Sequence, residues 1–119
     1  MPALRKGARN MTTYVTTINE IEGLHYYPDA PDNVSFLRHP HRHIFHVECR
    51  FKVSHDNREI EIFTQEEEIT RYLTERFGNP CMFGRMSCEM IAVDIINAFP
   101  ETLECKVTED GKGGAIVQR

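Results

Sequence analysis

The chain has 119 residues, enough for one domain with a modest hydrophobic core but too few for two. Its 18 acidic and 14 basic side chains give a formal net charge of -4, which argues against a protein that binds nucleic acid through its phosphates. No apolar run is long enough to span a bilayer, and residues 1–10 lack the apolar stretch of a signal peptide, so we expect a cytoplasmic protein that does not enter a membrane.

The first segment of the chain, residues 1–11, carries basic side chains at Arg5, Lys6 and Arg9 and shows no apolar pattern. We expect it to be a flexible arm or a segment that docks on a partner. The remaining residues, 12–119, contain no internal repeat and no low-complexity segment, and we expect them to form a single domain.

The first half of this domain has the residue pattern of β-strands. Residues 12–25 are rich in β-branched side chains, which favour a strand. Residues 26–33 are rich in proline, aspartate and asparagine and predict a loop. In residues 43–53, one set of alternate positions is mostly apolar and the other is mostly polar, which predicts a strand with one buried face. Residues 58–63 follow a polar turn and predict a short returning strand.

Two segments with helical spacing follow. Residues 65–77 place apolar side chains on one stripe, with Thr64 as the expected N-cap and acidic residues in the first turn. Residues 87–99 have a second apolar stripe, with Ser87 as the expected N-cap, and Pro100 ends this helix because proline cannot continue it.

The last part of the chain returns to the strand pattern. Residues 78–85 are expected to be a loop between the helices, because they begin with Gly-Asn-Pro. Residues 103–109 alternate and predict a strand, and residues 115–118 predict a final strand after a glycine-rich turn. The order β-β-α-α-β-β predicts an α+β fold, with an antiparallel sheet and two helices on one of its faces.

Four of the six histidines fall within residues 39–47, and three histidines together suit a metal ion. Side chains at positions i and i+2 of a strand share a face, so His41 and His43 can point to the same ion. His25 ends the preceding predicted strand and is the natural third ligand. Three imidazole ligands with an open fourth position are typical of catalytic zinc, although imidazole also suits iron, nickel and copper. The alternatives are solvated loop histidines and a pH-responsive surface without metal.

The other histidines are expected to lie outside this cluster. His39 precedes a proline in the loop, and His46 points to the opposite face of the strand, so both are interpreted as surface groups or as neighbours of the ligands. His55 lies in the predicted turn, where we expect it to be solvated.

The cysteines show neither the spacing of a zinc site nor that of a disulfide framework. We expect most of them to be small reduced side chains of the core. They are Cys49, Cys81, Cys88 and Cys105.

Three motifs occur in the order in which a known family has them. Residues 41–47 read H-x-H-x-F-x-V after a strand-end histidine, His25. Residues 86–92 keep the hydroxyl, glutamate and alanine of the family's P-T-x-E-x-x-A, and residues 107–110 keep the glutamate of its v-x-E-t. In these motifs, between His25 and Val117, the chain resembles the 6-pyruvoyl-tetrahydropterin synthase family, which includes the 6-carboxytetrahydropterin synthases of queuosine biosynthesis.

The resemblance implies a tunnelling fold (T-fold) that assembles through its sheets into homo-oligomers, trimers or hexamers. It implies zinc on His25, His41 and His43, where the metal polarises oxygens of the substrate side chain. It gives Glu109 the role of anchoring a pterin or related heterocycle, because a carboxylate accepts strong hydrogen bonds from ring nitrogens. Glu89 would support substrate binding from the start of the second helix; the plainer interpretation is a favourable charge at a helix N-terminus.

The chain departs from the family in the groups that transfer protons. The family usually has a cysteine shortly before the first histidine of H-x-H, and residues 34–40 contain none. It also has an Asp-His pair between its helices, and residues 78–85 contain neither residue. Cys81 and His39 are the candidate catalytic replacements, although a packed thiol and a solvated loop histidine are the plainer interpretations.

Two functions are therefore open at this point. The first is a zinc-dependent carbon-oxygen lyase that acts on a pterin-like heterocycle with a non-standard acid-base group. The second is a non-catalytic, zinc-containing T-fold oligomer that binds a purine or pterin or serves as an interaction scaffold.

Overall fold

The computed structural model describes residues 10–119 of the chain. Most of the expected N-terminal arm, residues 1–9, lies outside the described residues. The elements, in chain order, are β1 (Tyr14–His25), the 3-10 helix η1 (Asp32–Arg38), β2 (His41–Lys52), α2 (Ile62–Phe77), β3 (Cys81–Gly84), α3 (Cys88–Ala98), β4 (Thr102–Glu109) and β5 (Gly113–Gln118).

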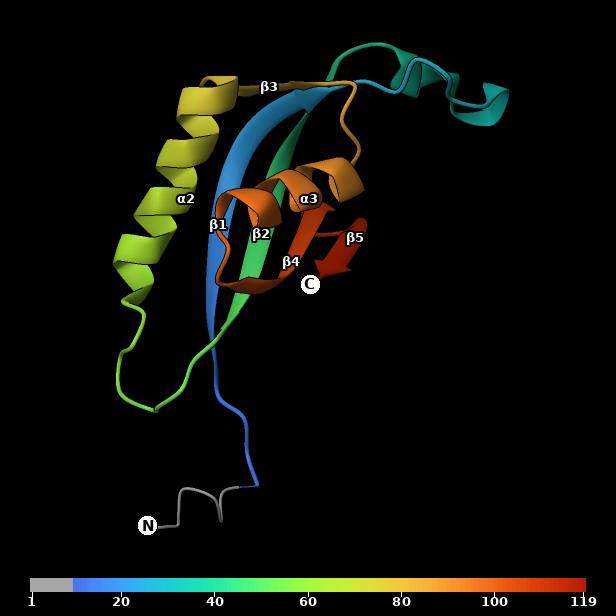
Figure 1. Cartoon of the computed structure of the whole chain (residues 1–119). Coiled ribbons are helices and arrows are strands. Elements are labelled where there is room, and N and C mark those ends of the chain that lie inside the picture. Colours follow the sequence, from blue (N-terminus) through green and yellow to red (C-terminus); the bar gives the residue numbers. More distant parts are fainter. Residues whose placement is uncertain (1–9) are drawn as a thin grey trace.

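One five-stranded sheet organises these elements, in the order β3-β1-β2-β4-β5. The neighbours β1–β2, β2–β4 and β4–β5 are antiparallel, and only the short β3 pairs in parallel, with the end of β1. Figure 1 shows α2 beside β1, and α3 packs across β4 and β5 on the same face of the sheet. The predicted α+β fold, with a mostly antiparallel sheet and both helices on one face, is confirmed. In the described part of the chain, no helix combines the length and apolarity needed to cross a membrane.

The pairing of β1 with β2 is long and regular, and it determines which residues meet at its ends. It runs without interruption from Tyr14 opposite Lys52 to His25 opposite His41. Alternation along β2 buries Phe45, which faces the helices with the other inward side chains of the strand, as the sequence predicted. The last residue of β1 and the first of β2 therefore lie side by side at one end of the sheet.

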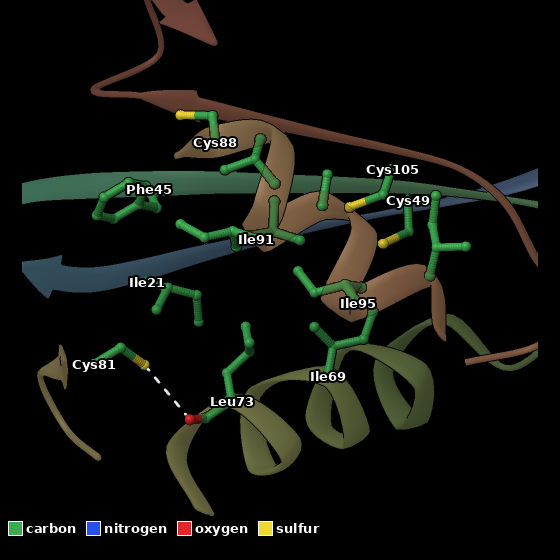
Figure 2. Packing of buried hydrophobic residues seen from close by; sticks show 14 of the residues in the cluster. Ile21, Phe45, Cys49, Ile69, Leu73, Cys81, Cys88, Ile91, Ile95 and Cys105 are labelled. Atoms are coloured by element: carbon green, nitrogen blue, oxygen red, sulfur yellow. Dashed lines mark hydrogen bonds between the residues drawn. The ribbon is translucent and has the colours of Figure 1, made fainter. Parts of the chain in front are cut away.

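The core lies between this sheet face and the two helices. Ile69 and Leu73 of α2 and Ile91 and Ile95 of α3 are fully buried, and Figure 2 shows them converging below the strands. These side chains recur at helical spacing, which is why both helices were predictable. Ser87 caps α3 as expected, because its hydroxyl oxygen accepts a hydrogen bond from the backbone N–H of Met90.

All four cysteines are free and buried, which confirms their interpretation as reduced core side chains. Cys49 and Cys105 lie directly opposite each other on β2 and β4. The thiol of Cys81 donates a hydrogen bond to the backbone carbonyl of Leu73, with a sulfur–oxygen distance of 3.6 Å (Figure 2).

The segment before α2 differs from its prediction. Residues 58–63 were expected to form a strand, but the helix begins at Ile62, inside that segment. Glu61 is the N-cap, not Thr64, because the Glu61 carboxylate accepts hydrogen bonds from the backbone N–H groups of Phe63 and Thr64. Thr64 lies in the first turn, where its hydroxyl donates to the same carboxylate. The first N–H groups of a helix have no partner within the helix, and Glu61 supplies one. This stabilises a helix that begins at Ile62 more than a short alternating pattern favours a strand.

The connection between the helices also differs from its prediction, because it contains strand β3. Its four residues alternate, with Cys81 and Phe83 buried and Met82 exposed. Gly23 of β1 lies opposite Cys81, and a side chain there would collide with the ring of Phe83, 2.7 Å from its Cε2. The short strand therefore depends on a glycine in the neighbouring strand for its close packing.

Two adjacent glycines at the start of β5 test how closely this strand packs against β4. A Cβ atom at Gly114 would overlap the backbone carbonyl of Val107 and lie 2.6 Å from the Cα of Thr108, whereas a Cβ at Gly113 would meet nothing within 4 Å. Gly114→Ala should therefore displace β5 from β4 and lower the free energy of unfolding by about 1–3 kcal/mol. Gly113→Ala should change it by less than about 0.5 kcal/mol. Urea denaturation of the two variants checks this, and equal midpoints would contradict it.

Candidate metal centre

Three imidazole rings meet at the end of the β1–β2 hairpin. His25 is the last residue of β1, His41 is the first of β2, and His43 follows on the same face. Their ring centroids are 4.6 Å (His25–His41), 5.0 Å (His41–His43) and 5.4 Å (His25–His43) apart, and one ring nitrogen from each lies within 4.8 Å of the other two. The strand register, together with the two-residue period, brings the three predicted ligands together.

Each ring has a hydrogen-bond acceptor at its Nδ1 atom. The backbone carbonyl of Met86 lies 2.9 Å from Nδ1 of His25, and that of His39 lies 2.9 Å from Nδ1 of His41. The carboxylate of Asp110 lies 2.7 Å from Nδ1 of His43. These oxygens only accept hydrogen bonds, so Nδ1 carries the proton in all three rings. In the neutral form of each ring, Nε2 then carries the free lone pair, and metal-binding histidines are commonly fixed in this way.

Two of these Nε2 atoms are inaccessible to solvent and unsatisfied. Within residues 10–119, Nε2 of His25 and Nε2 of His43 have no hydrogen-bond partner. They lie 3.0 Å and 3.5 Å from the two carboxylate oxygens of Glu109, at ion-pair distance but without hydrogen-bond geometry. Lone pairs buried against a carboxylate are costly unless a cation lies among them. Neutral imidazoles suit zinc, and also iron, nickel and copper, so the residues fit a bound transition metal.

The surroundings of His25 favour its neutral form. Burial lowers the pKa of His25, because the charged ring would lose its hydration. The Met86 carbonyl and the charge of Glu109 oppose this effect, whereas His41 and His43 add to it. Metal ions bind neutral imidazole, so the lowered pKa reduces competition from protons.

Glu109 ends β4 and extends its carboxylate toward the histidines. The thiol of Cys88, the first residue of α3, lies 3.7 Å from Oε2 of Glu109 and donates a hydrogen bond to it. Burial, and then the charges of Glu109 and Glu89, raises the pKa of Cys88 to about 12, so this thiol keeps its proton. The carboxylate of Glu109 is therefore supported from the helix side.

Asp110 follows Glu109 and connects β4 with β2. Its backbone N–H donates to the carbonyl of Ile44, and its carboxylate accepts from the N–H of Ile44 as well as from His43. The hydrogen bond from Ile44 and then that from His43 lower the pKa of Asp110. Sequence reasoning missed Asp110 and Cys88; their only signal was adjacency to Glu109 and Glu89, and it does not reveal contact with the histidines.

A pocket of about 950 Å³ opens beside the cluster. Its walls come from the β1–η1 connection, the start of α3, the end of β4 and the first residues of β5. Glu89 lies on its wall, exposed, in the first turn of α3. Residues of the wall with chemical groups for binding include His25, His41, Tyr26, Arg85, Glu89 and Glu109.

The two candidate catalytic residues lie elsewhere. Cys81 is buried under α2 and is not part of the pocket wall; burial raises its pKa to about 11. His39 is exposed and contributes its backbone carbonyl, not its ring, to the cluster. His46 faces the other side of the sheet, 3.6 Å from Glu20, and His55 pairs with Glu59 at 3.7 Å.

The chain matches no protein-family model and no curated protein. Its function is therefore argued from its own geometry: an α+β domain with a five-stranded sheet that carries three histidines able to hold a metal ion.

Proposed function

We propose that this protein binds zinc through His25, His41 and His43 and uses the adjoining pocket to bind a small molecule. The observation that carries the proposal is the orientation of the three rings. Each Nδ1 has an acceptor of its own, and within residues 10–119 the Nε2 atoms of His25 and His43 are buried without a hydrogen-bond partner, beside the carboxylate of Glu109. Such an arrangement is stable when a cation occupies the space among the rings.

The resemblance of the motifs to the 6-pyruvoyl-tetrahydropterin synthases suggests the class of ligand and the T-fold. A pocket of about 950 Å³ has room for a pterin or a purine, and Tyr26 and Leu37 on its wall offer apolar contact to a flat ring. Glu89 on the same wall is positioned to accept a hydrogen bond from a ring nitrogen. When bound, zinc would supply Lewis-acid polarisation of a substrate oxygen.

The distribution of proton carriers favours the second of the two functions. Cys81 lies outside the pocket wall, and the ring of His39 does not join the cluster. A ligand beside the metal therefore meets neither candidate, which supports a protein that binds a heterocycle without the usual lyase reaction. The alternative is a lyase that uses another acid-base group.

Assembly into a homo-oligomer, trimer or hexamer, belongs to the same proposal. Within residues 10–119, β1 pairs with another strand on one side only between Tyr14 and Glu22, because β3 reaches no further than Gly23. The backbone N–H of Ile18 donates to the carboxylate of Glu66 instead. β5 forms the opposite edge of the sheet, and Ile18 and Ile116 are exposed on these edge strands. Unpaired edges of this kind are available for strand pairing with another copy of the chain.

Elemental analysis of untagged protein, purified without added metal or chelator, tests the metal site directly. We expect close to one zinc per chain, together with a loss of thermal stability in chelator that zinc reverses. A polyhistidine tag would itself bind metal and must be absent. Protein that holds no transition metal and takes up none on titration would overturn the proposal. With zinc in place, incubation with pterins and purines then separates the two functions, because a binding protein returns the ligand unchanged, whereas a lyase releases a product.

A further inference from the structure

Glu109 is the charged group nearest to the unsatisfied ring nitrogens. Its Oε2 atom lies 3.0 Å from Nε2 of His25, and its Oε1 atom lies 3.5 Å from Nε2 of His43. His25 is only 8% exposed, and neither nitrogen has a hydrogen-bond partner in the described part of the chain. The carboxylate therefore lies directly beside two ring nitrogens that are able to bind a cation.

These separations match those between ligand atoms that share one metal ion. Zinc binds imidazole nitrogen and carboxylate oxygen at about 2.0–2.2 Å, so two ligand atoms of a tetrahedral site lie about 3.4 Å apart and those of an octahedral site about 3.0 Å apart. The observed distances of 3.0 Å and 3.5 Å lie in the same range. With respect to His25 and His43, the carboxylate is thus placed as a ligand would be.

The environment of the carboxylate is also that of a metal ligand. The thiol of Cys88, the first residue of α3, is 6% exposed and donates to Oε2 of Glu109 from the helix side of the sheet. Carboxylates that bind metals are commonly held by a second hydrogen bond of this kind. With Cys88 included, each of the four groups around the proposed metal has its own supporting partner; the other three are the carbonyls of Met86 and His39 and the carboxylate of Asp110.

We propose that Glu109 is the fourth protein ligand of this metal, which gives a site of three histidines and one glutamate. The inference rests on the metal site proposed above and changes its chemistry. The carboxylate would then occupy the position that three histidines leave open, so a pocket molecule would reach the ion only if the carboxylate moved aside. Glu109 also lines the pocket, which gives the displaced carboxylate a place to go. A carboxylate on the metal is not free to anchor a heterocycle, so the two roles exclude each other in the resting protein.

The experiment uses Co²⁺ as the probe, because its visible absorption spectrum changes when one of its ligands changes. Wild-type protein, Glu109→Gln and Glu104→Gln are each stripped of metal and titrated with Co²⁺. Glu104 lies on the same strand and pairs with Arg50, so its variant is a matched control outside the cluster. Melting of the three metal-free proteins shows whether each variant is folded.

We expect Glu109→Gln to bind Co²⁺ at least about tenfold more weakly, since even the loss of an outer hydrogen-bond partner has an effect of that size. Its spectrum should differ from that of the wild type, while Glu104→Gln should match the wild type in both measurements. If folded Glu109→Gln has wild-type affinity and spectrum, the fourth ligand is overturned and the three-histidine site stands. If the wild-type protein binds no Co²⁺, the metal site itself is overturned. If Glu109→Gln does not melt cooperatively, Cys88→Ala is measured in its place. We expect Cys88→Ala to bind Co²⁺ more weakly than the wild type, because it removes the hydrogen bond that supports Glu109. Wild-type affinity in Cys88→Ala would then overturn the inference.

Discussion

Replacing His41 with alanine is expected to abolish stoichiometric metal binding and to lower the melting temperature of the metal-loaded protein by about 10 °C. A metal present at a hundredfold its dissociation constant stabilises the folded state by about 3 kcal/mol. In a chain of this length, that corresponds to about 10 °C. The ring of His41 is half-buried, and the hydrogen bond of its Nδ1 goes to the carbonyl of His39, only two residues earlier. Its removal should therefore matter little once the metal is gone.

This difference separates loss of metal from loss of packing. In chelator, wild-type protein and His41→Ala should melt at similar temperatures, and only the wild type should respond to added zinc. His55→Ala is the control, because His55 is exposed in the turn after β2 and lies away from the cluster. Full zinc occupancy in His41→Ala would remove this residue from the ligand set.

Phe45→Ala should be the most destabilising single substitution near the site. The ring of Phe45 is fully buried and meets the rings of His25, His43 and Phe83 edge-on, with centroids 5.1, 5.6 and 5.0 Å away. Truncating a buried phenylalanine to alanine costs about 3–5 kcal/mol, because it removes apolar contacts and leaves a cavity. Here the cavity would lie directly below two proposed ligands, so zinc affinity should fall together with stability.

Urea denaturation in chelator measures the first effect, and zinc titration of the folded variant measures the second. Phe63→Ala is the matched control, because Phe63 is 76% exposed in the first turn of α2. It should change the free energy of unfolding by no more than about 0.5 kcal/mol. Equal unfolding midpoints for the two variants would show that Phe45 does not support the site.

The clustering of the three histidines could be predicted because the relation between them is mostly local. His41 and His43 share a face through the two-residue period of a strand, and His25 ends the strand that precedes them. The alternation in residues 43–53 also indicated which face of β2 is buried. The register of His25 opposite His41 could only be guessed, because it depends on how the connection with η1 folds back.

The other parts of the site depend on contacts that no local pattern encodes. Glu109 and Asp110 reach the histidines because β4 pairs with β2, and Cys88 reaches Glu109 because α3 packs on β4. The motif resemblance selects Glu109 and implies that it anchors a ring. A sequence motif contains no distances, so it cannot show that this carboxylate lies beside His25 and His43. The strand β3 was missed for a similar reason. Its four residues are too short a segment for a reliable alternating pattern, and they form a strand because they pair with β1.

The pairing of β1 with β2 also has a consequence for the order in which the protein folds. Contacts between segments close in sequence form before those that close long loops, because the entropy of loop closure rises with separation. His25, His41 and His43 all belong to this one hairpin, whereas Glu109 lies opposite Phe45 after an intervening stretch of about half the chain. We therefore expect the imidazoles to come together first during folding, and the carboxylate to be the last of the four groups to arrive.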